Sequence, residues 1–397
     1  MNIKQQLRRL NLFGFSACLR IPDAVWVVLL AARGFSLWQI GIAECLFHLV
    51  SLLAEVPSGM AADLLGRRRT LTMAGLCGIA SALLMACSTR FFGVCLSMVF
   101  SALACNFISG SDEALLYDSL LQSGRENDYL AVNARYTQIQ TLGSMLSNIA
   151  SLLTGFLNFV GLYLLDAAVC CIRVLSAWSL TEPTVTEAQA LRRDHPFQAL
   201  GSRFRTHVKE VGLFLQTHPR TAMVMLADGL LTLPSFLTLM FLQQRLHELG
   251  LAAMWLGLPI LCISLSRMVG VSIGKRLRPM ALRTLYIFCT LLVGAGTIIA
   301  GAAPLLPAVL GAMAAACCMD IWILHLQNHL NQLFPSDRRA TLVSVNMMAY
   351  SLLMIFASPI VGWLGDYTGT AGTGLCALGA VIAAAGILTV FLKKTSK

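Results

Sequence analysis

Charged residues are scarce in this sequence. Asp, Glu, Lys and Arg make up 12% of its 397 residues and apolar residues make up 57%, against roughly 25% and 45–50% in a soluble globular domain. A soluble fold of this length exposes far more polar surface than such a composition supplies. The composition therefore excludes an ordinary soluble enzyme and predicts that much of the surface faces lipid.

Signatures of several functional classes are missing too. No two of the 13 cysteines have the CxxC spacing of a metal or redox site, and neither the HExxH metalloprotease motif nor the GxxxxGK[ST] nucleotide-binding motif occurs. The net charge of +10 comes from small basic clusters between apolar runs, without zinc-finger spacing or a basic domain interleaved with aromatic residues. We therefore expect no metal, no cofactor, no ATP drive and no nucleic-acid partner.

Long apolar runs are what the sequence has in abundance. About 20 residues of helix cross the hydrocarbon core of a bilayer, and charge, Gly or Pro bounds twelve runs of roughly this length. The runs cover residues 11–33, 37–58, 69–88, 91–121, 133–157, 160–181, 221–244, 252–273, 281–302, 306–334, 337–362 and 371–392. The sequence thus predicts an all-α polytopic membrane protein with 12 transmembrane helices.

The basic residues predict how these helices are oriented. With the N-terminus in the cytoplasm, nearly all of the 29 Lys and Arg lie on or near the cytoplasmic side. The exceptions are Arg33, Arg90 and Arg245 outside and Arg20, Arg173 and Arg267 within spans. Because Lys and Arg favour cytoplasmic loops, we expect a multi-pass protein of the cell (plasma or inner) membrane with both termini in the cytoplasm.

One connection is much longer than the others. Residues 182–220 combine charged side chains with apolar ones, a pattern typical of an amphipathic segment on a membrane surface. This connection predicts three parts: an N-terminal six-helix bundle, residues 1–181, a cytoplasmic amphipathic linker, residues 182–220, and a C-terminal six-helix bundle, residues 221–397.

The two predicted bundles share landmarks at one constant spacing of 208 residues. The pairs at this spacing are Gly66 with Gly274, Arg67 with Lys275, Arg68 with Arg276, Asp112 with Asp320, and Arg20 with Asp228. Parallel repeats of this kind are a feature of transporters, whose substrate site lies between the halves near the middle of the bilayer. The sequence therefore predicts two pseudo-symmetric bundles.

Residues 59–69 read GMAADLLGRRR, which resembles the loop motif G-x-x-x-D-x-x-G-R-[KR] between the second and third helices of the major facilitator superfamily. Gly59, Asp63, Gly66, Arg67 and Arg68 match this motif in place. With the layout of six plus six helices, the resemblance covers the whole chain and implies the fold of this superfamily. The chain looks similar to bacterial efflux members.

The resemblance also implies a conformational latch. In this superfamily the acid of the motif binds the N-terminus of the eleventh helix, here near residues 337–340, and an acid low on the fourth helix, here Asp118, holds the arginine of the motif. Asp63, Arg67 and Asp118 would then form a latch that is closed while the cavity faces outward. Anions are favoured at helix N-termini, which gives the contact a physical basis. The alternative is a solvated loop that only sets topology.

Ionisable residues within spans are costly and are therefore functional candidates. Those expected to couple protons or line the cavity are Arg20, Asp23, Asp112, Glu113, Asp228, Arg267 and Asp320. Similar depths predict that Arg20 pairs with Glu113 and that Asp228 pairs with Arg267. Asp320 has no evident basic partner, and we expect it to bind a proton. Static pairing that orders the bundle is the alternative.

Three further residues are candidates for the substrate cavity. Trp26 and Trp322 lie at middle depth, where an aromatic ring can stack on a ligand, although packing within the bundle is the better explanation of each. His325 and His329 share a helix face at the spacing of two metal ligands. Polar packing is the better explanation for them, because no third or fourth ligand accompanies the pair.

These features predict a monomeric secondary transporter that works by alternating access, with a small-molecule substrate, protons and the lipid bilayer as its partners. The first hypothesis is proton-coupled efflux, by antiport, of small amphipathic compounds or drugs. Proton-coupled uptake of a small metabolite by symport is the alternative, because the fifth run, 133–157, lacks the G-P-x-x-G-G signature of drug/proton antiporters. An intramembrane enzyme is a remote alternative, and no pore repeat or sensing domain points to a channel or receptor.

Overall fold

The computed structural model describes residues 2–183, 216–217, 219–277, 280–333 and 339–391. These residues form α-helices and short 3₁₀ helices, and none of them forms a strand. Within the described residues, ten segments are helical, long and apolar enough to cross a membrane. The predicted all-α polytopic fold class is confirmed. The first and fifth predicted spans are outside the ten, because one is interrupted and the other is polar.

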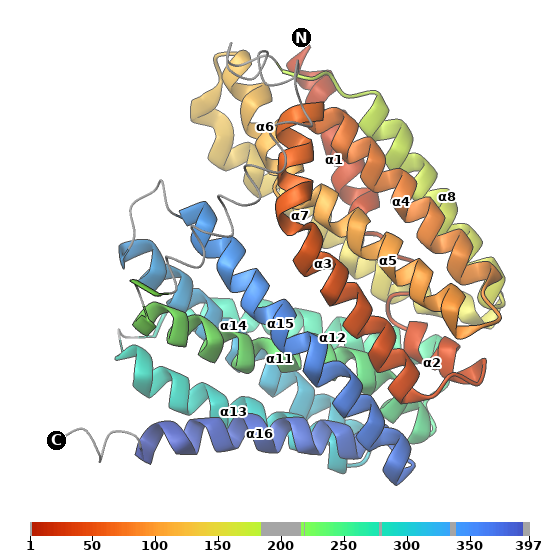
Figure 1. The fold of residues 1–397 in the computed structure, drawn as a ribbon, viewed down its shortest axis with the longest axis vertical. Coiled ribbons are helices and arrows are strands. Elements are labelled where there is room, and N and C mark those ends of the chain that lie inside the picture. Colours follow the sequence, from red (N-terminus) through yellow and green to blue (C-terminus); the bar gives the residue numbers. More distant parts are fainter. Residues whose placement is uncertain (1, 184–215, 218, 278–279, 334–338, 392–397) are drawn as a thin grey trace. The chain divides into compact units, whose positions relative to one another are not determined.

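The helices are labelled as in Figure 1. Those before residue 184 are α1 (Ile3–Cys18), α2 (Trp26–Ala32), α3 (Leu37–Leu65), α4 (Arg67–Cys87), α5 (Phe91–Ile108), α6 (Ser111–Gln122), η1 (Glu126–Asp128), α7 (Tyr129–Ile149), η2 (Ala150–Gly155) and α8 (Phe159–Trp178). Those after residue 215 are α11 (Pro219–Glu248), η3 (Ala253–Trp255), α12 (Gly257–Gly274), α13 (Leu282–Ala302), α14 (Leu305–Leu333), α15 (Arg339–Thr368) and α16 (Ala371–Phe391).

Contacts along the backbone divide the chain into two compact units. The first is Met1–Asp23 with Leu46–Phe214, and the second is Ala24–Cys45 with Leu215–Lys397. The short segment 24–45, which holds α2 and the start of α3, therefore packs with the helices of the second half. Most of the predicted linker lies outside the described residues, and the predicted domain boundaries stay a prediction.

Hydrogen bonds hold the segment 24–45 within the second unit. The carboxylate of Asp366, on α15, accepts the backbone N–H groups of Leu37 at 2.9 Å and Trp38 at 2.7 Å. These N–H groups belong to the first turn of α3, and the N–H groups of a first turn have no acceptors within their own helix. Gln243 of α11 accepts the N–H of Val27 at 3.3 Å.

Each unit repeats one pattern of helix packing. In the first unit α4 packs along α5 and α8, and α1 packs along α7. In the second unit α13 packs along α14 and α16, and α11 packs along α15. Figure 1 shows the pairs α4 with α8 and α13 with α16 running side by side. Counted in chain order, the partners are equivalent spans, as the sequence repeat predicts.

Non-helical residues interrupt two of the expected spans, the first and the fourth. The first, 11–33, breaks after Cys18 and resumes at Trp26; Pro22 lies in the break and has no N–H to donate to a helix. The fourth, 91–121, breaks at Ser109 and Gly110, where Gly110 has a φ of 70°. Apolar composition predicts that a segment enters the membrane. It does not predict whether the segment is helical throughout, because neighbouring helices can supply hydrogen-bond partners for non-helical backbone groups.

Glycines allow α13 and α14 to approach closely. A Cβ atom on Gly296 would lie 2.6 Å from the carbonyl oxygen of Gly311, and a Cβ atom on Gly311 would lie 2.7 Å from the carbonyl oxygen of Gly296. Helices in membranes associate through such close packing of small residues. The contact between α13 and α14 therefore depends on both positions lacking a side chain.

We expect Gly311→Ala to lower the thermal unfolding midpoint of the purified protein. The added methyl group must push two backbones apart, and overpacking of this kind costs about 1–3 kcal/mol. The matched control is Gly59→Ala, because the Cβ position of Gly59 in α3 has no atom within 4 Å. Gly59→Ala is expected to leave the midpoint unchanged or raise it. An unchanged midpoint for Gly311→Ala would contradict this account of the packing.

Candidate functional site

The first unit brings Arg20 to the interruption of the fourth span. Arg20 lies in the break between α1 and α2, and its Nη2 donates to Sγ of Cys105 at 2.8 Å, in the last turn of α5. A cation is favoured at the C-terminal end of a helix. Asp23 and Asp166 also interact electrostatically with this guanidinium. Arg20 thus links the break in the first span to the end of α5, where the fourth span is interrupted.

The predicted pair of Arg20 and Glu113 is wrong. Among the described residues the structure has no ion pair between them, and Glu113 is an exposed residue in the first turn of α6. Equal depth along two helices does not fix the direction in which each side chain points. The unpredicted turn at Gly110 changes that direction for the whole start of α6.

Asp112, the neighbour of Glu113, is buried and is bound by neutral donors. Its Oδ2 accepts the hydroxyl of Tyr136 at 2.9 Å and the side-chain amide of Gln140 at 3.2 Å, both from α7. No ion pair to Asp112 exists in the described part of the chain. The sequence analysis missed both partners; the signal available was the concentration of polar residues in the fifth run. Asp112 is thus a carboxylate inside the bundle without a cation.

The second unit contains a two-pronged ion pair between α12 and α14. Nε of Arg267 lies 3.0 Å from Oδ2 of Asp320, and Nη2 lies 3.1 Å from Oδ1. Two parallel hydrogen bonds of this kind are the strong geometry for arginine and a carboxylate. The expectations that Asp320 has no basic partner and that Arg267 pairs with Asp228 are both wrong. α12 packs directly along α14, and sequence depth alone could not reveal this neighbour.

Asp228 of α11 is instead bound by two neutral donors. Its Oδ1 accepts the indole N–H of Trp322 at 2.7 Å, and its Oδ2 accepts the side-chain amide of Asn346 at 2.8 Å. The two units therefore each hold one buried carboxylate with neutral partners, Asp112 and Asp228. The carbonyl oxygen of the Asn346 side chain is buried and lacks a hydrogen-bond partner in the described part of the chain.

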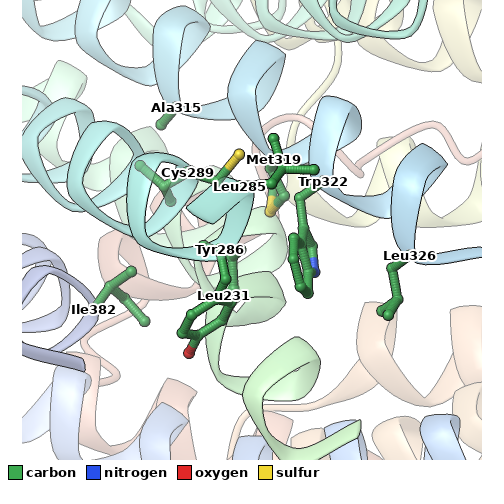
Figure 2. Close-up of a cluster of buried hydrophobic side chains, with 10 residues drawn as sticks. Leu231, Leu285, Tyr286, Cys289, Ala315, Met319, Trp322, Leu326 and Ile382 are labelled. Carbon is green, nitrogen blue, oxygen red and sulfur yellow. The ribbon is translucent and has the colours of Figure 1, made fainter. Parts of the chain in front are cut away.

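Trp322 lies in the apolar core of the second unit rather than in an open cavity. It is 1% exposed and packs edge-on against Tyr286, with ring centroids 5.2 Å apart. Figure 2 shows its ring among Leu231, Leu285 and Met319. Packing within the bundle, rather than stacking on a ligand, therefore explains the position of Trp322. Trp26, the other aromatic candidate, is the first residue of α2 and is partly buried.

Two other features of the second unit are structural. Nε2 of His325 lies 3.1 Å from the carbonyl oxygen of Gly274, which fits the polar-packing explanation of this histidine. Residues Gly270 to Gly274 read GVSIG, the GxSxG spelling of a hydrolase nucleophile turn. Ser272, however, lies inside α12 and its hydroxyl donates to the Met268 carbonyl at 2.9 Å. It is an ordinary helical serine, since a nucleophile turn joins a strand to a helix.

The motif residues lie at the junction of α3 and α4. Gly59 and Asp63 are in α3, which continues to Leu65, and Gly66, with a φ of 91°, is the one residue between the helices. The guanidinium of Arg67 contacts the Asp118 carboxylate and donates to the Ala114 carbonyl at 2.7 Å. The structure thus brings together Arg67 and Asp118, as the resemblance implied. The side chain of Asp63 and residues 334–338 lie outside the described residues.

Glu182 is a second acid at this junction, and the sequence analysis missed it. Its carboxylate accepts the backbone N–H groups of Arg67 at 2.8 Å and Arg68 at 2.7 Å. It therefore caps the N-terminus of α4, where unpaired N–H groups and the helix dipole favour an anion. The available signal was an acid placed directly after the sixth apolar run, which the sequence analysis assigned to the linker.

Buried charges and carboxylates inside two repeated sets of apolar helices define a polytopic membrane transporter. The family model of the Major Facilitator Superfamily matches residues 11–349, and the chain belongs to this superfamily. The sequence matches none of the curated proteins with which it was compared.

Solved structures similar to this chain are transporters. A mutant of the nucleoside transporter NupG has a TM-score of 0.78 at 17% sequence identity, with 98% of each chain covered. A D-xylose-proton symporter has a TM-score of 0.74 at 11% identity, with 98% of this chain and 97% of the other covered. The xylose transporter XylE from E. coli, in a partially occluded inward-open conformation, has a TM-score of 0.68 at 12% identity, with 100% of each chain covered. At these identities the likeness shows the fold.

We expect Asp118→Asn to slow transport several-fold without reducing the amount of folded protein in the membrane. Arg67 would keep the Ala114 carbonyl but lose its carboxylate partner, and charge-assisted bonds are about twice as strong as neutral ones. The measurement is the initial transport rate in proteoliposomes. The control is Asp128→Asn, which removes an exposed pair with Arg125 of the kind that contributes little. Equal rates for the two variants would remove Asp118 from the transport cycle.

Proposed function

We propose that this transporter takes up a small hydrophilic solute together with protons. The observation that carries the proposal is the ion pair of Arg267 and Asp320 inside the helices of the second unit. The Asp320 side chain is 11% exposed and that of Arg267 is 38% exposed, and a buried carboxylate is costly unless a cation satisfies it. Protonation of Asp320 would neutralise the carboxylate and release the guanidinium, so binding of a proton and binding of a solute would depend on the same pair.

The surroundings of Arg267 support a solute role for the released guanidinium. Arg267 lines a small cavity of about 10 Å³ with Ser235 and Thr238 of α11 and with alanines of α14. Thr238 is 5% exposed, and its hydroxyl lacks a hydrogen-bond partner among the residues that the structure describes. A cavity of this size has room for about one water molecule. A polar group of a solute would satisfy both the hydroxyl and the guanidinium.

The buried polar groups of both units support a hydrophilic solute rather than an amphipathic drug. Sites for drug-like ligands are predominantly apolar with a few polar groups. Here Asp112 and Asp228 are buried carboxylates bound by neutral donors. Two similar solved structures, a nucleoside transporter and a D-xylose-proton symporter, support small polar solutes and proton coupling.

Efflux by antiport stays a prediction from the sequence, because a transporter of this kind can move its solute in either direction. The experiment is a proton-flux assay with purified protein in liposomes that contain a pH dye. Inward gradients of uridine, D-xylose, amino acids and lipophilic dyes are imposed in turn. Acidification of the interior during solute entry supports symport, whereas alkalinisation supports antiport. If none of these solutes causes proton movement, the proposal of proton coupling is contradicted for them.

We expect Asp320→Asn to abolish the solute-driven proton movement while exchange of labelled solute across the membrane continues. Asparagine cannot take up a proton in the pH range of the assay, and it leaves Arg267 permanently free for the solute. The measurement compares proton flux and solute exchange in the same liposomes. The control is Asp128→Asn, at an exposed ion pair. Proton flux at the wild-type level in Asp320→Asn would remove Asp320 from the proton pathway.

We propose that both termini face the cytoplasm, as the distribution of Lys and Arg predicts. The test uses His247→Cys, at the end of α11, and Met280→Cys, before α13, which are exposed positions. A maleimide that cannot cross the membrane is expected to label the His247→Cys variant in intact cells and the Met280→Cys variant only after permeabilisation. The unsubstituted protein corrects for its native cysteines. The reverse pattern would invert the proposed orientation.

A further inference from the structure

Helix α8 carries two charged residues that the proposed mechanism does not use. Asp166 and Arg173 lie about two turns apart, and Arg173 is 4% exposed. A buried arginine is costly unless its donors are satisfied. Among the described residues Arg173 forms no ion pair. The hydrogen bonds of Arg173 and Asp166 instead go to backbone groups of the interrupted first span.

Arg173 binds the end of α1. Its Nη2 donates to the carbonyl oxygens of Ser16 at 2.6 Å and Ala17 at 3.3 Å. These carbonyls lie in the last turn of α1, which ends at Cys18, and the last turn of a helix has no N–H partners of its own. The side chain reaches them past Gly78 of α4, where a Cβ atom would lie 3.2 Å from Nη1 of Arg173.

Asp166 binds the break itself. Its Oδ1 accepts the backbone N–H of Ile21 at 2.9 Å. From α7, the hydroxyl of Ser147 donates to the carbonyl of Arg20. Backbone groups inside a membrane must find partners within the protein. Side chains of α7 and α8 thus supply bonds that a continuous first helix would have made for itself.

Arg20 lies in the centre of these contacts. Its own carbonyl is bound by Ser147, and the N–H of the next residue, Ile21, is bound by Asp166. Both bonds fix one peptide group, the one that joins Arg20 to Ile21 on the C-terminal side of the Arg20 Cα, while Arg173 holds the end of α1 on the N-terminal side. Together these contacts restrict the direction in which the side chain of Arg20 leaves the backbone. That direction is the one in which the guanidinium reaches Cys105 at 2.8 Å.

We propose that Asp166 and Arg173 are positioning residues that hold the break in the first span and thereby aim Arg20 at Cys105. Arg20 then presents a fixed cation at the end of α5, where the fourth span is interrupted. The use of that cation for solute binding rests on the proposed function, whereas the geometry that holds it does not.

The experiment measures the reaction of native Cys105 with N-ethylmaleimide, followed for each cysteine by mass spectrometry of the full-length protein. Asp166→Ala leaves the Ile21 N–H without its acceptor, and loss of one buried hydrogen-bond partner costs enough free energy to raise the labelling rate of Cys105 about tenfold. Arg173→Lys is expected to act in the same direction, because a lysine amine cannot reproduce the planar reach of the guanidinium. Asp166→Asn keeps an oxygen for the N–H and is expected to restore most of the protection.

Two controls separate positioning from loss of the fold. Cys289, in the core of the second unit, is 1% exposed and is expected to keep its wild-type labelling rate in every variant. Glu248→Ala is the matched substitution, because this carboxylate also accepts a backbone N–H at a helix end, that of Ala371 at 3.0 Å, but lies in the second unit. It is expected to leave Cys105 unchanged.

Unchanged labelling of Cys105 in both Asp166→Ala and Arg173→Lys would overturn the proposal. Equal increases at Cys105 and Cys289 would also overturn it, because the two residues would then serve only the stability of the whole fold. Labelling needs no transported solute, so its outcome is independent of the liposome assay. A specific increase at Cys105 with no solute-driven proton flux in the wild-type protein would leave the positioning role standing and reject the proposed function.

Discussion

The structure depends on one constraint: inside a bilayer, the backbone N–H and carbonyl groups have only protein to bind to. A continuous helix meets this constraint by itself, and a broken helix must borrow partners from its neighbours. The first span breaks between Cys18 and Trp26, and α7 and α8 supply the missing partners through Ser147, Asp166 and Arg173. The polar side chains at this break are therefore a condition for the fold as well as candidates for function.

The same constraint explains why charged residues occur in pairs or among neutral donors. Arg267 and Asp320 satisfy each other across α12 and α14, and Asp228 is satisfied by an indole and an amide. An ion pair can be opened by a single proton, whereas a carboxylate among neutral donors has no paired cation to release. The second unit thus holds two carboxylates whose surroundings suit different tasks.

Composition and apolar runs were enough to predict the fold class and the positions of the helices, because burial in lipid depends on hydrophobicity and length. The constant spacing between the halves predicted equivalent helix pairs. Pairings such as Arg267 with Asp320 were beyond reach, since they depend on which faces of two helices meet. Asp118 beside Arg67 was predicted from the resemblance, whereas Glu182, Tyr136 and Asn346 carry no motif and became visible as partners only in three dimensions.

The placement of residues 24–45 also has a consequence for biosynthesis. This segment is translated with the first half of the chain but packs with the second, where Asp366 caps its helix α3. Asp366 leaves the ribosome more than three hundred residues after Leu37 and Trp38, and Gln243 leaves it 216 residues after Val27. During synthesis the first half therefore enters the membrane before the N–H groups of Leu37 and Trp38 have the carboxylate of Asp366, and they gain it only when α15 has been inserted.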